Sequence, residues 1–233
     1  MVAISRRLAP GQLDGITGVA VLEVDTPHGQ AKVHVHAADQ PRAALVLGHG
    51  AAGGVTAPDL VAVTGAARSE GISVGLVEQP YRVAGRRSPA PAHQLDAAWT
   101  AVVDHLLASE LGGLPLVVGG RSSGARVACR TAEATGAVAV LCLAFPLQPP
   151  GRAERPSRLP ELDAVKVPML VVQGAGDPFG IPPAGTHRTV VQVPGNHSLR
   201  TNLQAVTDAV QDWLQVTLSA WPSSKRSGSR PPT

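Results

Sequence analysis

The 233-residue sequence predicts an α/β fold, in which a mostly parallel sheet carries helices on both faces and follows an N-terminal antiparallel hairpin. Continuous apolar runs of about five residues alternate with helical stretches, which is the pattern of a parallel sheet covered on both faces. The preceding stretch, residues 18–36, instead alternates apolar and polar side chains around a Pro27-His28-Gly29 turn. Such alternation is typical of an antiparallel pair of strands with one face in water.

The apolar runs and the helical periodicity predict the strands and helices that follow the hairpin. The expected strands are residues 43–47, 72–77, 114–118, 138–143, 167–172 and a shorter one at 189–193. The expected helices are residues 58–68, 94–109 and 124–135, and a closing helix marked by Leu199, Leu203, Val206, Val210 and Trp213. The segment 148–160, rich in Pro and Arg, is expected to be a surface loop between two strands. These elements leave no room for a large cap domain.

Length and composition indicate a single domain over residues 1–221, followed by a disordered basic tail at 222–233. The formal net charge is only +3, and part of the excess lies in the tail, so no basic face for nucleic acid is expected. No apolar run is long enough to span a membrane and no signal segment is visible, which predicts a cytoplasmic protein. Cys129 and Cys142 are expected to be reduced and buried, and no metal site is expected.

The pentapeptide Gly120-Arg121-Ser122-Ser123-Gly124 matches G-x-S-x-G and stands between an apolar strand and a helix of small residues. A serine on such a tight turn is lifted clear of the sheet, and the flanking glycines let the chain pass. A Gly/Ser turn by itself is common, so the motif needs partners. The sequence context indicates that Ser122 is a nucleophile.

Two residues downstream supply the partners in the order that this architecture requires, an acid and then a histidine. Asp177 follows the strand at 167–172, and His197 follows the strand at 189–193. Both therefore lie at carboxyl ends of strands, where a parallel sheet assembles its site. We expect His197 to act as the base for Ser122 and Asp177 to orient His197.

A glycine-rich loop, Leu47-Gly48-His49-Gly50-Ala51-Ala52-Gly53-Gly54, ends another apolar strand. It lacks the phosphate-loop and dinucleotide-loop patterns, so we interpret it as a source of backbone N–H groups for an oxyanion. The expected pair is the N–H of Ala51 and the N–H of Ser123. His49 comes too early in the chain to be the base and is expected to brace the loop.

Several motifs, among them L-G-H-G-A-x-G-G, G-G-R-S-S-G-A-R-V-A and Q-G-x-x-D-P-F-G, resemble one branch of the α/β hydrolases. It is the dienelactone-hydrolase-like group that includes the testis-expressed protein 30 and NSL-complex subunit 3 domains, and the similarity runs from about Leu45 to Trp213. The resemblance implies Ser122 as nucleophile, Asp177 as acid and His197 as base. Ser122 stands where dienelactone hydrolase proper has a cysteine. Some relatives serve as complex subunits, so the motif alone does not guarantee turnover.

The predicted function is cleavage of an ester or thioester of a small acyl substrate, without a cofactor. Two alternatives remain: a catalytically silent interaction module on the same fold, and an acyltransferase with the same triad. Loop residues Tyr81, Arg82 and Arg86 are candidate substrate contacts, and Arg82 or Arg86 is expected to bind a carboxylate or phosphate on the substrate. Aromatic residues make up only 3% of the chain, which argues against a long lipid tunnel. The sequence leaves the substrate and the oligomeric state open.

Overall fold

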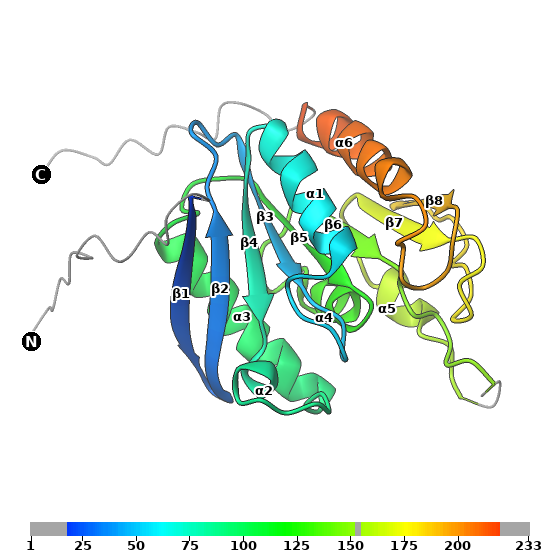
Figure 1. Ribbon diagram of the computed structural model, residues 1–233, viewed down its shortest axis with the longest axis horizontal. Helices are drawn as coiled ribbons and strands as arrows, with labels where there is room; N and C mark the ends of the chain where they lie inside the picture. Colours follow the sequence, from blue (N-terminus) through cyan, green and yellow to red (C-terminus); the bar gives the residue numbers. More distant parts are fainter. Residues whose placement is uncertain (1–17, 152–154, 220–233) are drawn as a thin grey trace, which may run out of the picture.

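A computed structural model describes residues 18–151 and 155–219 as one sheet with helices on both faces (Figure 1). The eight strands lie in the order β1-β2-β4-β3-β5-β6-β7-β8. From β4 to β8 along this order all neighbours are parallel, whereas β1 pairs antiparallel with β2 and β2 with β4. The predicted fold class is confirmed, including the N-terminal hairpin and the lack of a large cap domain among the described residues.

The elements follow one another in a strand-helix alternation. The strands are β1 Val19–Thr26, β2 Gly29–His36, β3 Ala43–Gly48, β4 Ile72–Glu78, β5 Leu116–Arg121, β6 Ala139–Leu143, β7 Met169–Gly174 and β8 Arg188–Val193. The helices are α1 Pro58–Ser69, α2 Pro80–Val83, α3 Ala92–Ala108, α4 Ser123–Thr131, α5 Leu159–Asp163 and α6 Leu203–Ser219.

Two apolar cores lie on opposite faces of the sheet because the central strands are apolar on both sides. All residues of β3, β6 and β7 are buried, whereas β2 buries every second residue. Helices α1 and α6 pack side by side over one face, and α3, α4 and α5 cover the other (Figure 1). The largest fully buried side chain, Trp99 of α3, lies in the core between the sheet and helices α3, α4 and α5. This arrangement leaves the carboxyl ends of the parallel strands together at one edge.

Some predicted boundaries were wrong. Helix α5 begins at Leu159, within the last two residues of the segment expected to be a loop, and Pro160 is suited to its first turn. Likewise Pro80 begins the single-turn helix α2, which periodicity could not reveal. The closing helix begins at Leu203, because Leu199 is buried with a positive φ of 52° before it. The helix after the G-x-S-x-G motif ends at Thr131 and not at residue 135.

Cys129 and Cys142 are both buried, as predicted, and their unbridged Sγ atoms lie 3.5 Å apart between α4 and β6. The contact with the Cys129 thiol, together with burial, raises the pKa of Cys142 well above its usual value, which keeps the thiol protonated. None of the helices in the described ranges is long and apolar enough to cross a bilayer. The predicted tail at 222–233 lies outside the described residues.

Candidate active site

Ser122 lies on the turn between β5 and α4 in a conformation that few residues other than glycine adopt. Its φ is 52° and its ψ is −109°. Its N–H donates a 2.9 Å hydrogen bond to the carbonyl of Leu143 at the end of β6. Such a conformation costs on the order of 1–3 kcal/mol and persists only where the surroundings enforce it. The strained strand-to-helix turn is the geometry that exposes a nucleophile.

Close packing explains why glycines flank the serine. A Cβ on Gly124 would lie 2.3 Å from the carbonyl oxygen of Gly48, and a Cβ on Gly120 would lie 2.6 Å from the same atom. Both distances are shorter than any real contact, so a side chain at either position would push α4 away from β3. The glycines therefore hold the serine turn against the end of β3, where the glycine-rich loop begins.

The structure brings Ser122, His197 and Asp177 into one chain of hydrogen bonds. Nε2 of His197 lies 2.9 Å from Oγ of Ser122, and Nδ1 lies 2.9 Å from Oδ2 of Asp177. The three residues follow β5, β8 and β7, at the carboxyl edge of the sheet, where β6 lies between β5 and β7. The Asp177 side chain is fully buried, whereas 19% of the His197 side chain is exposed. A ring that accepts the serine proton at Nε2 carries its own proton at Nδ1 and donates it to Asp177.

The carboxylate of Asp177 is fixed on both oxygens. Oδ1 accepts a 2.9 Å hydrogen bond from the N–H of Phe179, and Oδ2 accepts a 2.8 Å bond from Nε2 of the fully buried Gln173. The ring of Phe179 also lies 4.3 Å, centroid to centroid, from the ring of His197. These contacts hold the acid and the imidazole in one orientation.

Arg121 ties the serine turn to two other parts of the chain. Its Nη2 donates a 3.0 Å hydrogen bond to the backbone carbonyl of His197. Its Nε lies 2.8 Å from Oδ2 of Asp59, a fully buried carboxylate in the first turn of α1. Among the described residues, this ion pair is the contact that Oδ2 of Asp59 makes with an opposite charge. Burial raises the pKa of Asp59, and the charge of Arg121 opposes that rise.

His49 braces the glycine-rich loop as predicted. Its Nδ1 lies 2.8 Å from the carbonyl of Gly50, and its Nε2 accepts a 3.2 Å hydrogen bond from the N–H of Gln79. An acceptor at Nε2 requires the neutral tautomer with the proton on Nδ1. Burial lowers the pKa of His49, which favours this neutral form.

The two N–H groups that the sequence indicated for an oxyanion belong to Ala51 in the glycine-rich loop and to Ser123, the first residue of α4. A Cβ on Gly50 would lie 3.6 Å from Cβ of Ser122, so the loop lies beside the serine. Within the described ranges, the backbone N–H groups of Ala51 and Ser123 donate to no protein acceptor. Such unpaired donors beside a nucleophile are what an oxyanion hole requires.

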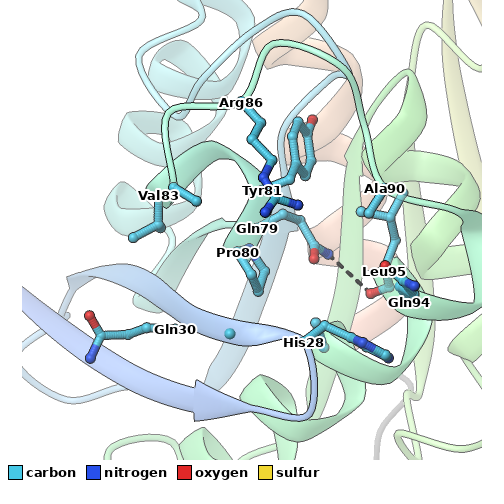
Figure 2. A pocket seen from close by; sticks show the side chains of 13 residues that line it. His28, Gln30, Gln79, Pro80, Tyr81, Val83, Arg86, Ala90, Gln94 and Leu95 are labelled. Atoms are coloured by element: carbon cyan, nitrogen blue, oxygen red, sulfur yellow. Dashed lines mark hydrogen bonds between the residues drawn. The ribbon is translucent and has the colours of Figure 1, made fainter.

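The residues predicted to contact substrate lie around helix α2. Tyr81 is buried, and its hydroxyl donates a 2.9 Å hydrogen bond to the carbonyl of Ala51, so it supports the glycine-rich loop. Tyr81 and Arg86 line a pocket of about 310 Å³, shown in Figure 2, and none of the three hydrogen-bonded triad residues lines it. Arg82 is partly exposed on α2 and does not line that pocket.

Three supporting residues escaped the sequence reasoning: Gln173, Arg121 and Asp59. Gln173 stands four residues before Asp177 in the Q-G-x-x-D motif, and Arg121 immediately precedes the nucleophile. Their positions in these motifs were therefore the signal that could have identified both. Asp59 had no such signal. In the described ranges no group of three or more His, Cys, Asp and Glu side chains is placed to hold a metal ion.

Comparison with known proteins supports the fold. Residues 41–217 match the family model described as an alpha/beta hydrolase domain. The chain belongs to the α/β-hydrolase family. No curated protein matches the sequence.

Solved structures share the fold at low sequence identity. A serine hydrolase without a lid from Xanthomonas campestris has a TM-score of 0.70 and 20% identity, over 93% of this chain and 100% of that chain. Est1E from Butyrivibrio proteoclasticus has a TM-score of 0.70 and 16% identity, over 85% and 99%. A dienelactone hydrolase from Anabaena variabilis also has a TM-score of 0.70 and 16% identity, over 85% and 97%.

Proposed function

We propose that the chain is a serine hydrolase that cleaves an ester or thioester of a small acyl substrate. The observation that carries this proposal is the hydrogen-bonded chain from Ser122 through His197 to Asp177. The motif resemblance to the dienelactone-hydrolase-like branch supports the same function. The site offers a nucleophile, a base, an orienting acid and two unpaired N–H donors, which together are the requirements of acyl transfer.

In the first step, His197 takes the hydroxyl proton while Oγ of Ser122 attacks the substrate carbonyl. The N–H groups of Ala51 and Ser123 stabilise the oxyanion of the tetrahedral intermediate. His197 then gives the proton to the leaving alcohol or thiol as the carbon–oxygen or carbon–sulfur bond breaks. An acyl group remains bound to Oγ of Ser122.

In the second step, His197 removes a proton from water, which attacks the acyl-enzyme carbonyl. The same N–H pair stabilises the second oxyanion, and the proton returns to Oγ as the acid leaves. Asp177 keeps the Nδ1 proton of His197 in place through both steps and stabilises the imidazolium. These steps need no metal or organic cofactor.

The decisive experiment is labelling with a fluorophosphonate, which reacts with an activated serine. Wild type should be labelled and Ser122→Ala should not, and the substitution should lower kcat by several orders of magnitude. Ser198→Ala, which changes the serine next to His197, is a matched control and should be labelled like wild type. Equal absence of labelling in wild type and Ser122→Ala would support a catalytically silent module instead.

A panel of esters and thioesters of different chain length then defines the substrate. Product analysis with added alcohol acceptors separates hydrolysis from acyl transfer to another molecule. We further propose that Arg82 or Arg86 binds an anionic group on the substrate. The Arg82→Ala and Arg86→Ala variants should then lose more kcat/KM with anionic esters than with neutral esters, and equal losses would refute this part.

A further inference from the structure

Phe179 turns the face of its ring toward the imidazole of His197. The two ring centroids lie 4.3 Å apart, and the ring planes are tilted by 38°. An edge-to-face pair has planes close to perpendicular, so this smaller tilt brings the face of the phenyl ring, and not its edge, to the imidazole. The face is the electron-rich side of the ring, and it attracts a cation within about 6 Å of the centroid.

The backbone holds the ring of Phe179 in this place. Its N–H donates a 2.9 Å hydrogen bond to Oδ1 of Asp177, and its carbonyl accepts a 2.9 Å bond from the N–H of Gln148. The N–H of Gly180 donates a 3.0 Å bond to the carbonyl of Asp177, which closes the turn. Phe179 and His197 are both partly buried, so water weakens an attraction between the rings less than it would on an open surface.

In the part of the chain that the structure describes, two charged side chains also contact His197. Asp177 favours a protonated ring, because its Oδ2 lies 2.9 Å from Nδ1. Arg121 opposes the charge, because its Nη2 lies 3.0 Å from the backbone carbonyl of His197. Asp59 offsets part of that effect, since its Oδ2 lies 2.8 Å from Nε of the same guanidinium. A change confined to the ring of Phe179 leaves these contacts in place and isolates the contribution of the ring.

We propose that Phe179 is a positioning residue whose ring face stabilises the imidazolium of His197, an inference that rests on the proposed function. The imidazole is neutral before it takes the hydroxyl proton of Ser122 at Nε2. It then carries a positive charge until it gives that proton to the leaving group. The attraction of the ring is therefore stronger in the charged stage than in the resting enzyme, and an interaction that strengthens in this way lowers the barrier.

Fluorinated phenylalanines in place of Phe179 test the ring face while the backbone hydrogen bonds and the shape of the ring are kept. A monofluorinated ring has a less electron-rich face, and a trifluorinated ring less still. We expect kcat for a neutral ester to fall about twofold with the first and about fivefold with the second. Phe179→Leu should lower kcat about tenfold, whereas Phe179→Tyr, which keeps an electron-rich face, should stay within about twofold of wild type.

The pH profile separates the electrostatic effect of the ring from a role in packing alone. The rise of kcat/KM with pH reports the loss of the proton from the base of the free enzyme. A weaker ring face stabilises the imidazolium less, so the midpoint of this rise should move to lower pH along the fluorinated series. A ring that only fills space would leave the midpoint unchanged. A fall in kcat without a shift of the midpoint, or no change in either, would overturn the proposal.

NMR titration of the imidazole of His197 tests the same contact without turnover, with the signals assigned by their loss in His197→Asn. The midpoint of this titration should also move to lower pH along the fluorinated series. If it does so while wild type cleaves no ester and takes no fluorophosphonate label, the interaction between the rings stands and the proposed function fails. If wild type is labelled at Ser122 but the midpoint does not move, the hydrolase stands and the role of Phe179 is refuted.

Discussion

Replacing Arg121 by methionine removes a guanidinium that contacts two distant parts of the chain, Asp59 and the carbonyl of His197. The partner carboxylate of Asp59 is fully buried and lies 2.8 Å from the guanidinium. Removing one member of a buried ion pair typically costs about 3–5 kcal/mol, because the remaining charge is left uncompensated. The lost hydrogen bond to the carbonyl of His197 acts in the same direction. We therefore expect Arg121→Met to lower the free energy of unfolding by about 3–5 kcal/mol, as measured in urea.

The pH dependence of this loss identifies its cause. Burial already raises the pKa of Asp59, and Arg121 opposes the rise, so the variant should raise that pKa further. A carboxyl group with a raised pKa in the folded state binds more protons folded than unfolded. Its contribution to stability is present at low pH and is lost as the pH rises through the raised pKa. The deficit of Arg121→Met should therefore shrink on acidification, and Asp59→Asn should rescue part of it in the double variant.

A matched control lies in the same part of the fold. Arg126 of α4 pairs with Glu161 of α5, but the two side chains are 27% and 19% exposed. Exposure to water weakens such ion pairs, so Arg126→Met should lower the free energy of unfolding clearly less than Arg121→Met does. Similar losses in the two variants, or a deficit of Arg121→Met that is independent of pH and of Asp59→Asn, would refute the reasoning. Folded Arg121→Met should also have a lower kcat in ester hydrolysis, because the His197 segment loses an anchor.

Three further variants test other contacts around the site. Gln173→Leu should lower kcat about tenfold by loosening Asp177, and an unchanged kcat in ester hydrolysis would exclude this role. Tyr81→Phe should lower the free energy of unfolding in urea by about 0.5–1.5 kcal/mol, because the hydrogen bond to the carbonyl of Ala51 is lost. An unchanged free energy of unfolding would show that Tyr81 does not support the loop. Because burial lowers the pKa of His49, the unfolded chain takes up the proton first, and wild-type stability should fall as the pH drops below 6.5. His49→Gln should flatten that fall in urea titrations at several pH values, and an equally steep fall would show that His49 is not the group involved.

The sequence was sufficient to predict those candidate site residues whose order along the chain is typical of the architecture. Ser122, Asp177 and His197 each follow an apolar strand, and a parallel sheet brings the ends of such strands to one edge. His49 could be assigned a bracing role because it precedes the nucleophile in the chain. These inferences needed only local patterns and one rule of topology.

The contacts between loops were beyond such reasoning. The pairing of Arg121 with Asp59 depends on how α1 approaches the end of β5, and no periodicity encodes that approach. Tyr81 was predicted to contact substrate, but α2 lies beside the glycine-rich loop and directs the Tyr81 hydroxyl to the carbonyl of Ala51. Short helices such as α2 and α5 were missed because a single turn carries no detectable period.

The hydrogen bond between Ser122 and His197 joins residues that are 75 positions apart. The loop between β6 and α5 divides the chain so that the serine belongs to the first part and both of its partners belong to the second. Neither part alone contains a complete proton-transfer chain. During synthesis, a nascent chain that ends before β8 lacks His197, so its Ser122 has no base. Two fragments separated at this loop would therefore gain the proposed esterase activity only by reassembling the sheet, which would make turnover a direct reporter of fragment complementation.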